Sequence, residues 1–203
     1  MISAKRANAV RNLVSLYTVV IGAALSLAVV SLIDPKQGLD SVQSSAVYLF
    51  LAFVLTLIPF YHGALRHLDD TYLESPRHNI RDHVLIFDFL LLVGHAMAFV
   101  CLSLLLRKPT QFAFVFLSVL SVDIVWGGMT HLFANPAEKS GAEGKWTVIN
   151  LVFAGALFAV LNYLDISWSS TAFEEKLAFP LLFVCALRTI VDYAFCYDFY
   201  FPQ

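Results

Sequence analysis

Six apolar runs, each long enough to cross a lipid bilayer, fill most of this 203-residue chain. A transmembrane helix needs about 20 predominantly apolar residues, and only helices or closed barrels satisfy every backbone hydrogen bond inside the hydrocarbon core. We therefore predict an all-α, polytopic membrane protein with six transmembrane helices, in which residues 1–203 form a single transmembrane domain. The predicted spans are residues 12–33, 42–65, 84–106, 109–133, 146–164 and 177–199.

The composition agrees with this class and excludes a soluble or nucleic-acid-binding domain. Apolar residues make up 59% of the chain and charged residues only 14%, against roughly 25% in a soluble domain. The 13 basic and 15 acidic residues give a formal net charge of −2, which leaves no basic surface for nucleic acid. The three cysteines all lie within the apolar runs, so we expect small buried side chains and no disulfide framework.

The basic residues are distributed unevenly between the two sides of the predicted membrane domain. Positively charged loops are retained on the cytoplasmic side, so the side with more Lys and Arg is predicted to be cytoplasmic. The N-terminal segment and the second and fourth connections hold eight of them, and the other connections hold four. We predict a multi-pass protein of a bacterial inner membrane with both termini in the cytoplasm. The eight are Lys5, Arg6, Arg11, Arg66, Arg77, Arg81, Lys139 and Lys145.

The fourth and sixth spans share a short pattern. Residues 122–126 read Val-Asp-Ile-Val-Trp, and residues 191–195 read Val-Asp-Tyr-Ala-Phe. The first, third and fifth spans each carry a glycine followed by small residues, at Gly22, Gly94 and Gly155. A threefold repeat of a two-helix hairpin would explain both patterns. Small residues recur in any packed membrane helix, so ordinary packing is the favoured alternative.

Ionisable side chains inside the apolar runs are the main functional signal of the sequence. A charged residue at the middle of a bilayer costs about 2.5–3.5 kcal/mol, so such residues must be paired, hydrated or functional. On the predicted orientation these side chains lie at one depth, in the cytoplasmic half of the membrane. Spacings of four, seven or eight residues place pairs of them on one helix face. We predict a cytoplasm-facing polar vestibule lined by His62, Asp88, His95, Asp123, His131, Arg188 and Asp192.

Charge balance limits the chemistry of this vestibule. Arg188 neutralises one carboxylate, either Asp192 one turn away or Asp123 on the neighbouring span, and leaves two aspartates without a cation. A buried carboxylate without a partner takes up a proton, binds a cation or lies on a hydrated path. We therefore predict a channel or transporter subunit for a cation or a proton, working as a homo-oligomer. The alternative is structural: the charges hold the bundle together, and the histidines bond to backbone or hydroxyl groups.

Residues 66–83 form the only sizeable connection and are dense in charge. The second span is predicted to continue as a helix beyond its apolar run until Ser75 and Pro76, because the residue before a proline is disfavoured in a helix. A charged cytoplasmic hairpin loop suits docking of a cytosolic partner. A second hypothesis is therefore a membrane effector or anchor subunit, for example of a membrane-disrupting bacterial defence module. The predicted docking residues are Arg66, His67, Asp69, Asp70, Arg77 and Arg81.

The sequence holds no motif for a metal, a cofactor or a catalytic residue. A zinc or iron site needs about three or four convergent ligands. His62 and His67 are separated by five residues, as are His78 and His83, which places the members of each pair on different helix faces. No Gly-rich phosphate loop, GxSxG elbow or HExxH pair occurs. We predict no bound metal and no cofactor, and a membrane-embedded enzyme acting on a lipid-linked substrate is the third hypothesis.

Overall fold

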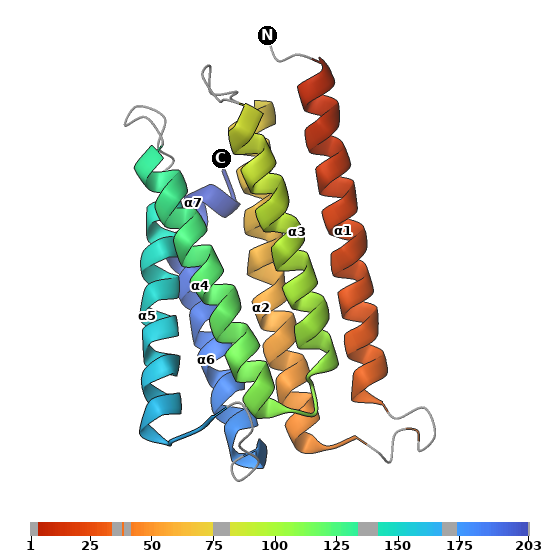
Figure 1. Cartoon of the computed structure of the whole chain (residues 1–203), viewed down its shortest axis with the longest axis vertical. Coiled ribbons are helices and arrows are strands. Elements are labelled where there is room, and N and C mark those ends of the chain that lie inside the picture. The colour runs from red at the N-terminus through yellow and green to blue at the C-terminus, as the bar shows by residue number, and fades with distance from the viewer. Residues whose placement is uncertain are drawn as a thin grey trace.

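A computed structural model of the chain describes residues 4–33, 38, 42–74, 82–133, 142–167 and 174–202. The protein is all-α, and six of its helices are long and apolar enough to cross a membrane, as the sequence predicts. The six run up and down side by side, and the chain enters and leaves the bundle at the same end (Figure 1). We call this end the terminal end and the opposite one the distal end. The helices are α1 (Ala4–Leu32), α2 (Ser44–Leu68), the π-helical η2 (Asp69–Glu74), α3 (Asp82–Leu104), α4 (Pro109–Phe133), α5 (Ala142–Tyr163), α6 (Glu174–Phe195) and α7 (Tyr197–Tyr200).

Helix ends differ from the ends of the apolar runs. α1 begins at Ala4 and not at residue 12, because the polar residues of its first turns continue the helical backbone outside the apolar run. α2 ends at Leu68 and passes directly into η2, so residues 66–74 are helical. This confirms the predicted helical extension and corrects the loop assignment of those residues. α6 ends at Phe195, and the last residues of the predicted sixth span form the separate helix α7.

The connection between α3 and α4 is anchored to the end of α1. The last carbonyl groups of a helix have no N–H partner within the helix. Arg107 supplies donors to two of them, with Nε 3.2 Å from the Ser31 carbonyl and Nη2 3.3 Å from the Leu32 carbonyl. A single charged side chain at the distal end therefore completes α1 and ties it to the turn between two other helices.

Apolar side chains fill most of the distal half of the bundle. Phe53, Phe99, Phe112 and Phe116, from α2, α3 and α4, have no exposed surface. The rings of Phe53 and Phe99 pack edge-to-face with their centres 6.1 Å apart. The closest helix pairs are α1 with α3, α2 with α6 and α4 with α5. This packing makes the distal half an apolar barrier.

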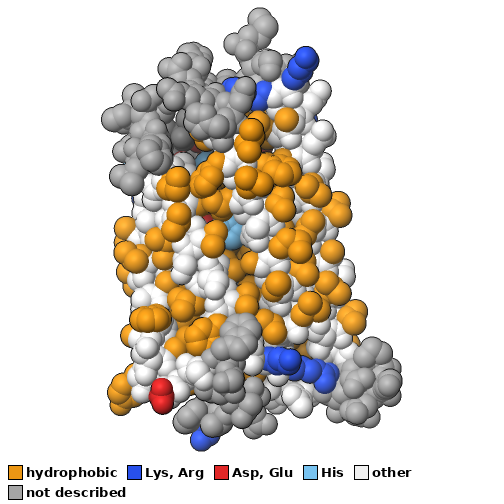
Figure 2. Space-filling model, viewed as in Figure 1, with side chains coloured by type: hydrophobic (Ala, Val, Ile, Leu, Met, Phe, Trp, Pro, Cys, Tyr) orange, Lys and Arg blue, Asp and Glu red, His pale blue; other side chains and the backbone are white. Residues whose placement is uncertain are grey.

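The outer surface of the bundle is also apolar. Side chains such as Val19, Val152 and Ile190 are more than half exposed, at 68%, 61% and 65%. Figure 2 shows apolar side chains spread over the face of the bundle, with Lys and Arg at its two ends. An outer surface covered with apolar side chains fits contact with lipid and not with water. The protein is therefore a multi-pass integral membrane protein, while its orientation, the identity of its membrane and the threefold repeat stay predictions.

Candidate functional site

Buried polar side chains gather between the centre of the bundle and its terminal end, in two clusters. They occupy the half of the bundle in which the sequence places the ionisable residues. We call the first the cavity cluster, which consists of His95, Asp123, Trp146, Asn150, Arg188, Asp192 and Tyr200. We call the second the Asp88 cluster, which consists of His67, Thr71, Tyr72, Asp88 and Trp126.

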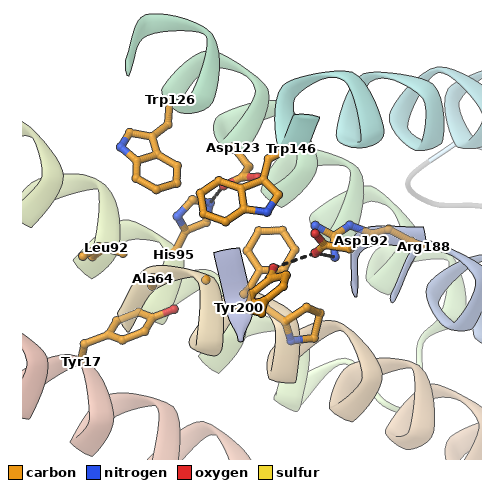
Figure 3. A pocket seen from close by; sticks show the side chains of 13 residues that line it. Tyr17, Ala64, Leu92, His95, Asp123, Trp126, Trp146, Arg188, Asp192 and Tyr200 are labelled. Carbon is orange, nitrogen blue, oxygen red and sulfur yellow. Dashed lines mark hydrogen bonds and ion pairs between the residues drawn. The ribbon is translucent and has the colours of Figure 1, made fainter. Parts of the chain in front are cut away.

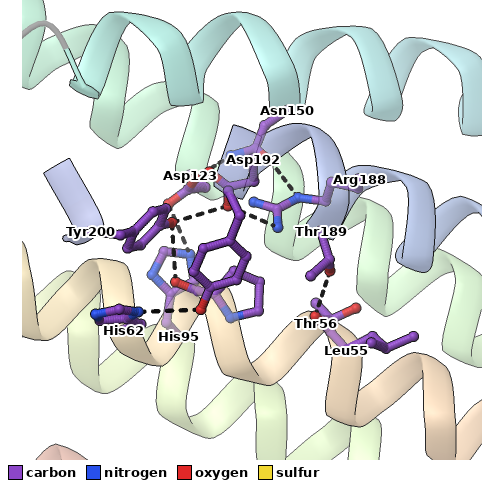
Figure 4. A network of polar contacts seen from close by, with 12 residues as sticks. Leu55, Thr56, His62, His95, Asp123, Asn150, Arg188, Thr189, Asp192 and Tyr200 are labelled. Carbon is purple, nitrogen blue, oxygen red and sulfur yellow. Dashed lines mark hydrogen bonds and ion pairs between the residues drawn. The ribbon is translucent and has the colours of Figure 1, made fainter. Parts of the chain in front are cut away.

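A chain of charged and amide groups joins α4, α5 and α6 in the cavity cluster (Figure 4). Asn150 on α5 donates from Nδ2 to Asp123 Oδ2 on α4, and its Oδ1 accepts a 2.8 Å hydrogen bond from Arg188 Nε on α6. Arg188 Nη1 lies 3.5 Å from Asp192 Oδ2, one turn further along α6. Of the two predicted partners, Arg188 thus pairs directly with Asp192 and reaches Asp123 through an amide. Its charge is shared by both carboxylates.

Phe60 and Tyr200 complete the surroundings of this ion pair. The guanidinium carbon of Arg188 lies 4.4 Å from the centre of the Phe60 ring, a cation–π contact. The Tyr200 hydroxyl lies 3.1 Å from Asp192 Oδ2 and 3.4 Å from the Pro59 carbonyl. A phenol carries one proton, so this hydroxyl donates to one of the two oxygens at a time. Tyr200 therefore links the C-terminal helix to both α2 and α6.

Pro59 accounts for a further contact beside the ion pair. A proline has no N–H, so the carbonyl four residues earlier in its helix loses its usual partner. In α2 that carbonyl belongs to Leu55, and Thr189 on α6 donates to it from Oγ1 at 2.6 Å. Proline is tolerated inside a membrane helix when a neighbouring helix satisfies the freed group in this way. The contact fixes α6 against α2 next to Arg188.

His95 on α3 faces the cavity cluster from the opposite side. Its Nε2 lies 4.0 Å from Asp123 Oδ1, and its ring centre lies 5.6 Å from that of Phe60. The sequence groups His95 on one helix face with Asp88, whereas the structure brings it to Asp123 on α4. A separation of 4.0 Å is too long for a hydrogen bond. Nε2 therefore has no hydrogen-bond partner among the described residues.

These residues line a cavity of about 20 Å³, enough for about one water molecule. Figure 3 shows the lining side chains, with the indole nitrogen of Trp146 turned toward Asp192 and Arg188. Buried polar atoms in native proteins are almost always hydrogen-bonded, so unsatisfied atoms that share one cavity indicate a small polar occupant. Within the described part of the chain, four buried lining atoms have no hydrogen-bond partner: His95 Nε2, Trp146 Nε1, Arg188 Nη1 and Asp192 Oδ1.

The C-terminal segment, residues 196–202, lies over the cavity on its terminal side. Arg66 on α2 donates from Nε to the Phe199 carbonyl at 3.2 Å. Lys145 on α5 donates from Nζ to the Phe195 carbonyl at 2.8 Å. Cations are favourable at the C-terminal carbonyl groups of helices, which carry partial negative charge. The Arg66 bond thus ties the segment to α2, and the Lys145 bond ties the adjoining end of α6 to α5.

Two residues of this segment are buried: Cys196 is 2% exposed and Tyr200 is 3% exposed. Burial raises the pKa of the Cys196 thiol to about 12, and the nearby Asp192 carboxylate adds to the rise. The same two causes raise the pKa of the Tyr200 hydroxyl above its ordinary value. His62 on α2 packs with its ring centre 4.8 Å from that of Tyr200, and its Nδ1 lies 3.2 Å from the Tyr193 hydroxyl. His62, predicted to line the vestibule, therefore contacts the C-terminal segment outside the cavity lining.

The Asp88 cluster lies beside the cavity, and its contacts converge on one carboxylate. Trp126 Nε1 on α4 donates to Asp88 Oδ1 at 2.9 Å. The Tyr72 hydroxyl on η2 donates to Oδ2 at 2.7 Å, and His67 Nε2 on α2 lies 3.2 Å from the same oxygen. Asp88 itself is on α3, so one carboxylate joins four elements. Both of its oxygens are hydrogen-bonded.

His67 belongs to the interior and not to the solvated docking loop that the sequence predicts. Its side chain is 2% exposed and lies between Asp88 and Glu143, whose Oε1 is 4.0 Å from His67 Nδ1. The reason is the helical extension of α2, which keeps His67 packed against α3 and α5 beyond the end of the apolar run. Arg66 is engaged as well, through its bond to the Phe199 carbonyl.

The other predicted site residues lie elsewhere. The His131 ring is so close to Gly144 on α5 that a Cβ at this glycine would approach it to 3.3 Å. Asp69 and Asp70 are half-buried in η2. Outside the described residues lie Arg77 and Arg81. Of the seven predicted vestibule residues, the cavity lining unites four: His95, Asp123, Arg188 and Asp192.

Sequence reasoning missed Trp146 and Tyr200, which line the cavity with neutral donors. Trp146 follows the charged start of α5 and is typical of an interfacial aromatic residue. The predicted fifth span begins at Trp146, whereas Asp123 lies ten residues from the end of its own predicted span, so predicted depth does not group the two. Tyr200 lies beyond the end of the last predicted span, and no pattern along the chain marks it.

These observations define a six-helix integral membrane protein with a small, charged cavity between its helices. No family model, curated protein or solved structure matches this chain. In the described ranges, no group of three or more His, Cys, Asp or Glu side chains is placed to hold a metal ion. The cavity cluster is therefore the candidate functional site.

Proposed function

We propose that this protein transports a small cation, either a proton or a monovalent metal ion, across its membrane through the cavity cluster. The observation that carries the proposal is the burial of two aspartates, an arginine and a histidine around one water-sized cavity inside membrane-spanning helices. Ionisable residues are disfavoured in a bilayer, and those that face an internal cavity commonly mark ion or proton pathways. A purely structural network would satisfy its own polar atoms, as the Asp88 cluster does.

The packing favours a transporter over an open channel. The cavity admits about one water molecule, and the distal half is filled by buried side chains such as Phe53 and Phe99. An ion therefore crosses only if the helices repack between two states around a fixed site, as in alternating access. On the terminal side, the hydrogen bonds of Arg66 and Tyr200 that hold residues 196–202 are contacts that can break and reform in such a cycle.

The other hypotheses from the sequence are less favoured. A docking surface for a cytosolic partner loses Arg66 and His67, which are engaged inside the protein. A lipid head group does not fit a cavity of about 20 Å³, so an enzyme acting on a lipid-linked substrate would need a rearranged site. A homo-oligomer, the cytoplasmic placement of both termini and a bacterial inner membrane remain parts of the proposal.

Ion flux into proteoliposomes tests the proposal. Purified protein is reconstituted, gradients of H⁺, K⁺ and Na⁺ are imposed in turn, and dyes trapped inside report each ion. We expect the wild-type protein to dissipate at least one gradient faster than protein-free vesicles. Asp123→Asn keeps the shape of the side chain but removes its charge, and should lower this flux at least about tenfold, the equivalent of about 1.4 kcal/mol.

Asp165→Asn is the matched control for this substitution. Asp165 is exposed near the distal end of α5, and its φ of 51° lies in the left-handed region that asparagine tolerates. Its flux should equal that of the wild type. The proposal fails if vesicles with folded wild-type protein stay tight to all three ions, or if both variants conduct alike.

A further inference from the structure

We infer that the transported cation is the proton, and that one water molecule bound in the cavity passes it between His95 and Asp192. This inference rests on the proposed function and narrows its cargo. Its basis is the chemistry of the unsatisfied atoms that line the cavity. Among the described residues, His95 Nε2, Trp146 Nε1, Arg188 Nη1 and Asp192 Oδ1 have no hydrogen-bond partner.

Water matches this set of atoms in number and in type. Arg188 Nη1 and Trp146 Nε1 can only donate, whereas the ionised Asp192 Oδ1 can only accept. His95 Nε2 accepts when the imidazole is neutral and donates when it is charged. A water molecule accepts two hydrogen bonds and donates two, so it can bond to all four atoms at once. The cavity volume of about 20 Å³ also corresponds to about one water molecule.

A metal ion does not match the same set. An ion held by Asp192 would face the N–H groups of Arg188 and Trp146, which present positive hydrogens to the cavity. Metal cations in proteins are held by several oxygen ligands, whereas three of the four unsatisfied cavity atoms are nitrogens. An anion is disfavoured as well, because Asp123 and Asp192 both line the cavity. A neutral water molecule avoids both conflicts.

The transfer itself needs no further reactant. Protonated His95 takes the place of one of the other two donors at the water oxygen and donates to it from Nε2–H, while the water gives one of its own protons to Asp192 Oδ1. One N–H and one O–H bond break, and two O–H bonds form, one in the water and one on the carboxyl group. The imidazolium becomes neutral imidazole, and the carboxylate becomes a carboxylic acid.

Groups next to His95 and Asp192 stabilise the charged forms of these two residues, which are the ends of the proton path. Asp123 Oδ1, 4.0 Å from His95 Nε2, stabilises the imidazolium before the transfer. Arg188 stabilises the Asp192 carboxylate that receives the proton. On the far side of Asp192, the Tyr200 hydroxyl lies 3.1 Å from Oδ2 and continues the chain of polar groups toward the terminal end.

Replacement of the bulk cation tests the inference on the wild-type protein. A pH gradient is imposed on proteoliposomes that contain K⁺, Na⁺ or N-methylglucamine as the only bulk cation, with a permeant anion to compensate charge. We expect the same initial proton flux in all three. Proton flux that requires Na⁺ or K⁺, or metal flux without a change in pH, overturns the inference and leaves the proposed transport intact. Absence of any flux overturns both.

Trp146→Phe tests the bound water. This change keeps the aromatic ring and removes the N–H that donates to the water. We expect proton flux to fall about tenfold, the equivalent of one hydrogen bond of about 1.4 kcal/mol. The matched control is Tyr163→Phe, which removes a polar group from an aromatic side chain that is 89% exposed at the end of α5 and should conduct as the wild type does. Equal flux in the wild type and Trp146→Phe contradicts the inference.

A second variant tests the cavity without changing a hydrogen-bonding group. Ala64 lines the cavity, and Ala64→Val adds two methyl groups where the water is placed. We expect flux to be lost although circular dichroism and gel filtration report a folded protein. Unchanged flux through the filled cavity contradicts the inference.

Discussion

Both buried clusters of this protein contain aspartate among other polar side chains. They differ in whether the polar atoms have hydrogen-bond partners. The Asp88 carboxylate has partners on both oxygens, from Tyr72, His67 and Trp126. In the cavity cluster, Asp192 Oδ1 and Arg188 Nη1 have no hydrogen-bond partner in the described part of the chain. Both clusters lie at a similar depth, so burial alone does not separate them.

We propose that this difference separates a structural role from a functional one. A fully satisfied polar network rigidifies the elements that it joins, and its cost of desolvation is offset by its own bonds. Unsatisfied atoms around a cavity have instead been left available to an occupant. We therefore expect changes in the Asp88 cluster to alter stability more than flux, and changes in the cavity cluster to alter flux more than stability.

Asp88→Ala is expected to have the largest effect on stability. It leaves His67, Tyr72 and Trp126 buried without their acceptor, and each unsatisfied buried donor costs about 1–3 kcal/mol. Thermal unfolding in detergent measures this loss. Asp198→Ala, at an exposed aspartate of α7, is the control and should be neutral. A loss no larger than that of the control would remove the basis for calling the Asp88 cluster structural.

Thr189→Val is expected to have a smaller effect, of about 1 kcal/mol, in the range of interhelical hydrogen bonds in membranes. It removes the donor to the Leu55 carbonyl, which Pro59 leaves without a helical partner. In a Pro59→Ala background, the restored N–H satisfies that carbonyl, so Thr189→Val should cost less there. A double-mutant cycle of unfolding free energies measures the difference. Equal costs in the two backgrounds would show that the proline does not create this contact.

Chemical labelling of Cys196 tests whether the C-terminal segment covers the cavity, and it has the smallest expected effect. With a pKa raised to about 12, the thiol is about one part in ten thousand thiolate at pH 8, and this fraction grows as the pH rises toward 12. N-ethylmaleimide should therefore spare Cys196 in the folded protein and modify it after denaturation, as mass spectrometry of the peptides reports. Arg66→Gln, which releases the Phe199 carbonyl, should increase modification of Cys196. Equal labelling of Cys196 in the folded and the denatured protein would mean that the segment does not cover this site.

The class of fold follows from the sequence because the bilayer sets a minimum length for each apolar run. The helix ends do not follow in the same way. α1 begins at Ala4 and the helical path of α2 reaches Glu74, in both cases beyond the apolar residues, because hydropathy reports the lipid boundary and not the backbone conformation. The charged residues around His67 predicted an exposed side chain, but the structure buries it.

Much of the cavity could be predicted because a charged residue in a membrane span is costly unless it is paired, hydrated or functional. Asp123, Arg188 and Asp192 were found in this way. Their partners were harder to predict, since spacing along a helix gives the face of a residue and not the helix that faces it. The spacing of His95 and Asp88 places them on one helix face, but in the structure His95 Nε2 on α3 lies 4.0 Å from Asp123 on α4. Tyr200 carries no charge and lies outside the apolar run, so only the folded chain reveals it.

Proton flux through matched aspartate variants tests the central claim most directly. Asp192→Asn and Asp88→Asn are reconstituted side by side, and the initial flux is divided by the amount of folded protein. The account predicts that Asp192→Asn falls at least about tenfold below the wild type, the equivalent of about 1.4 kcal/mol. It predicts that Asp88→Asn, though less stable, stays close to the wild type. The reverse order, or equal flux in the two variants, would contradict it.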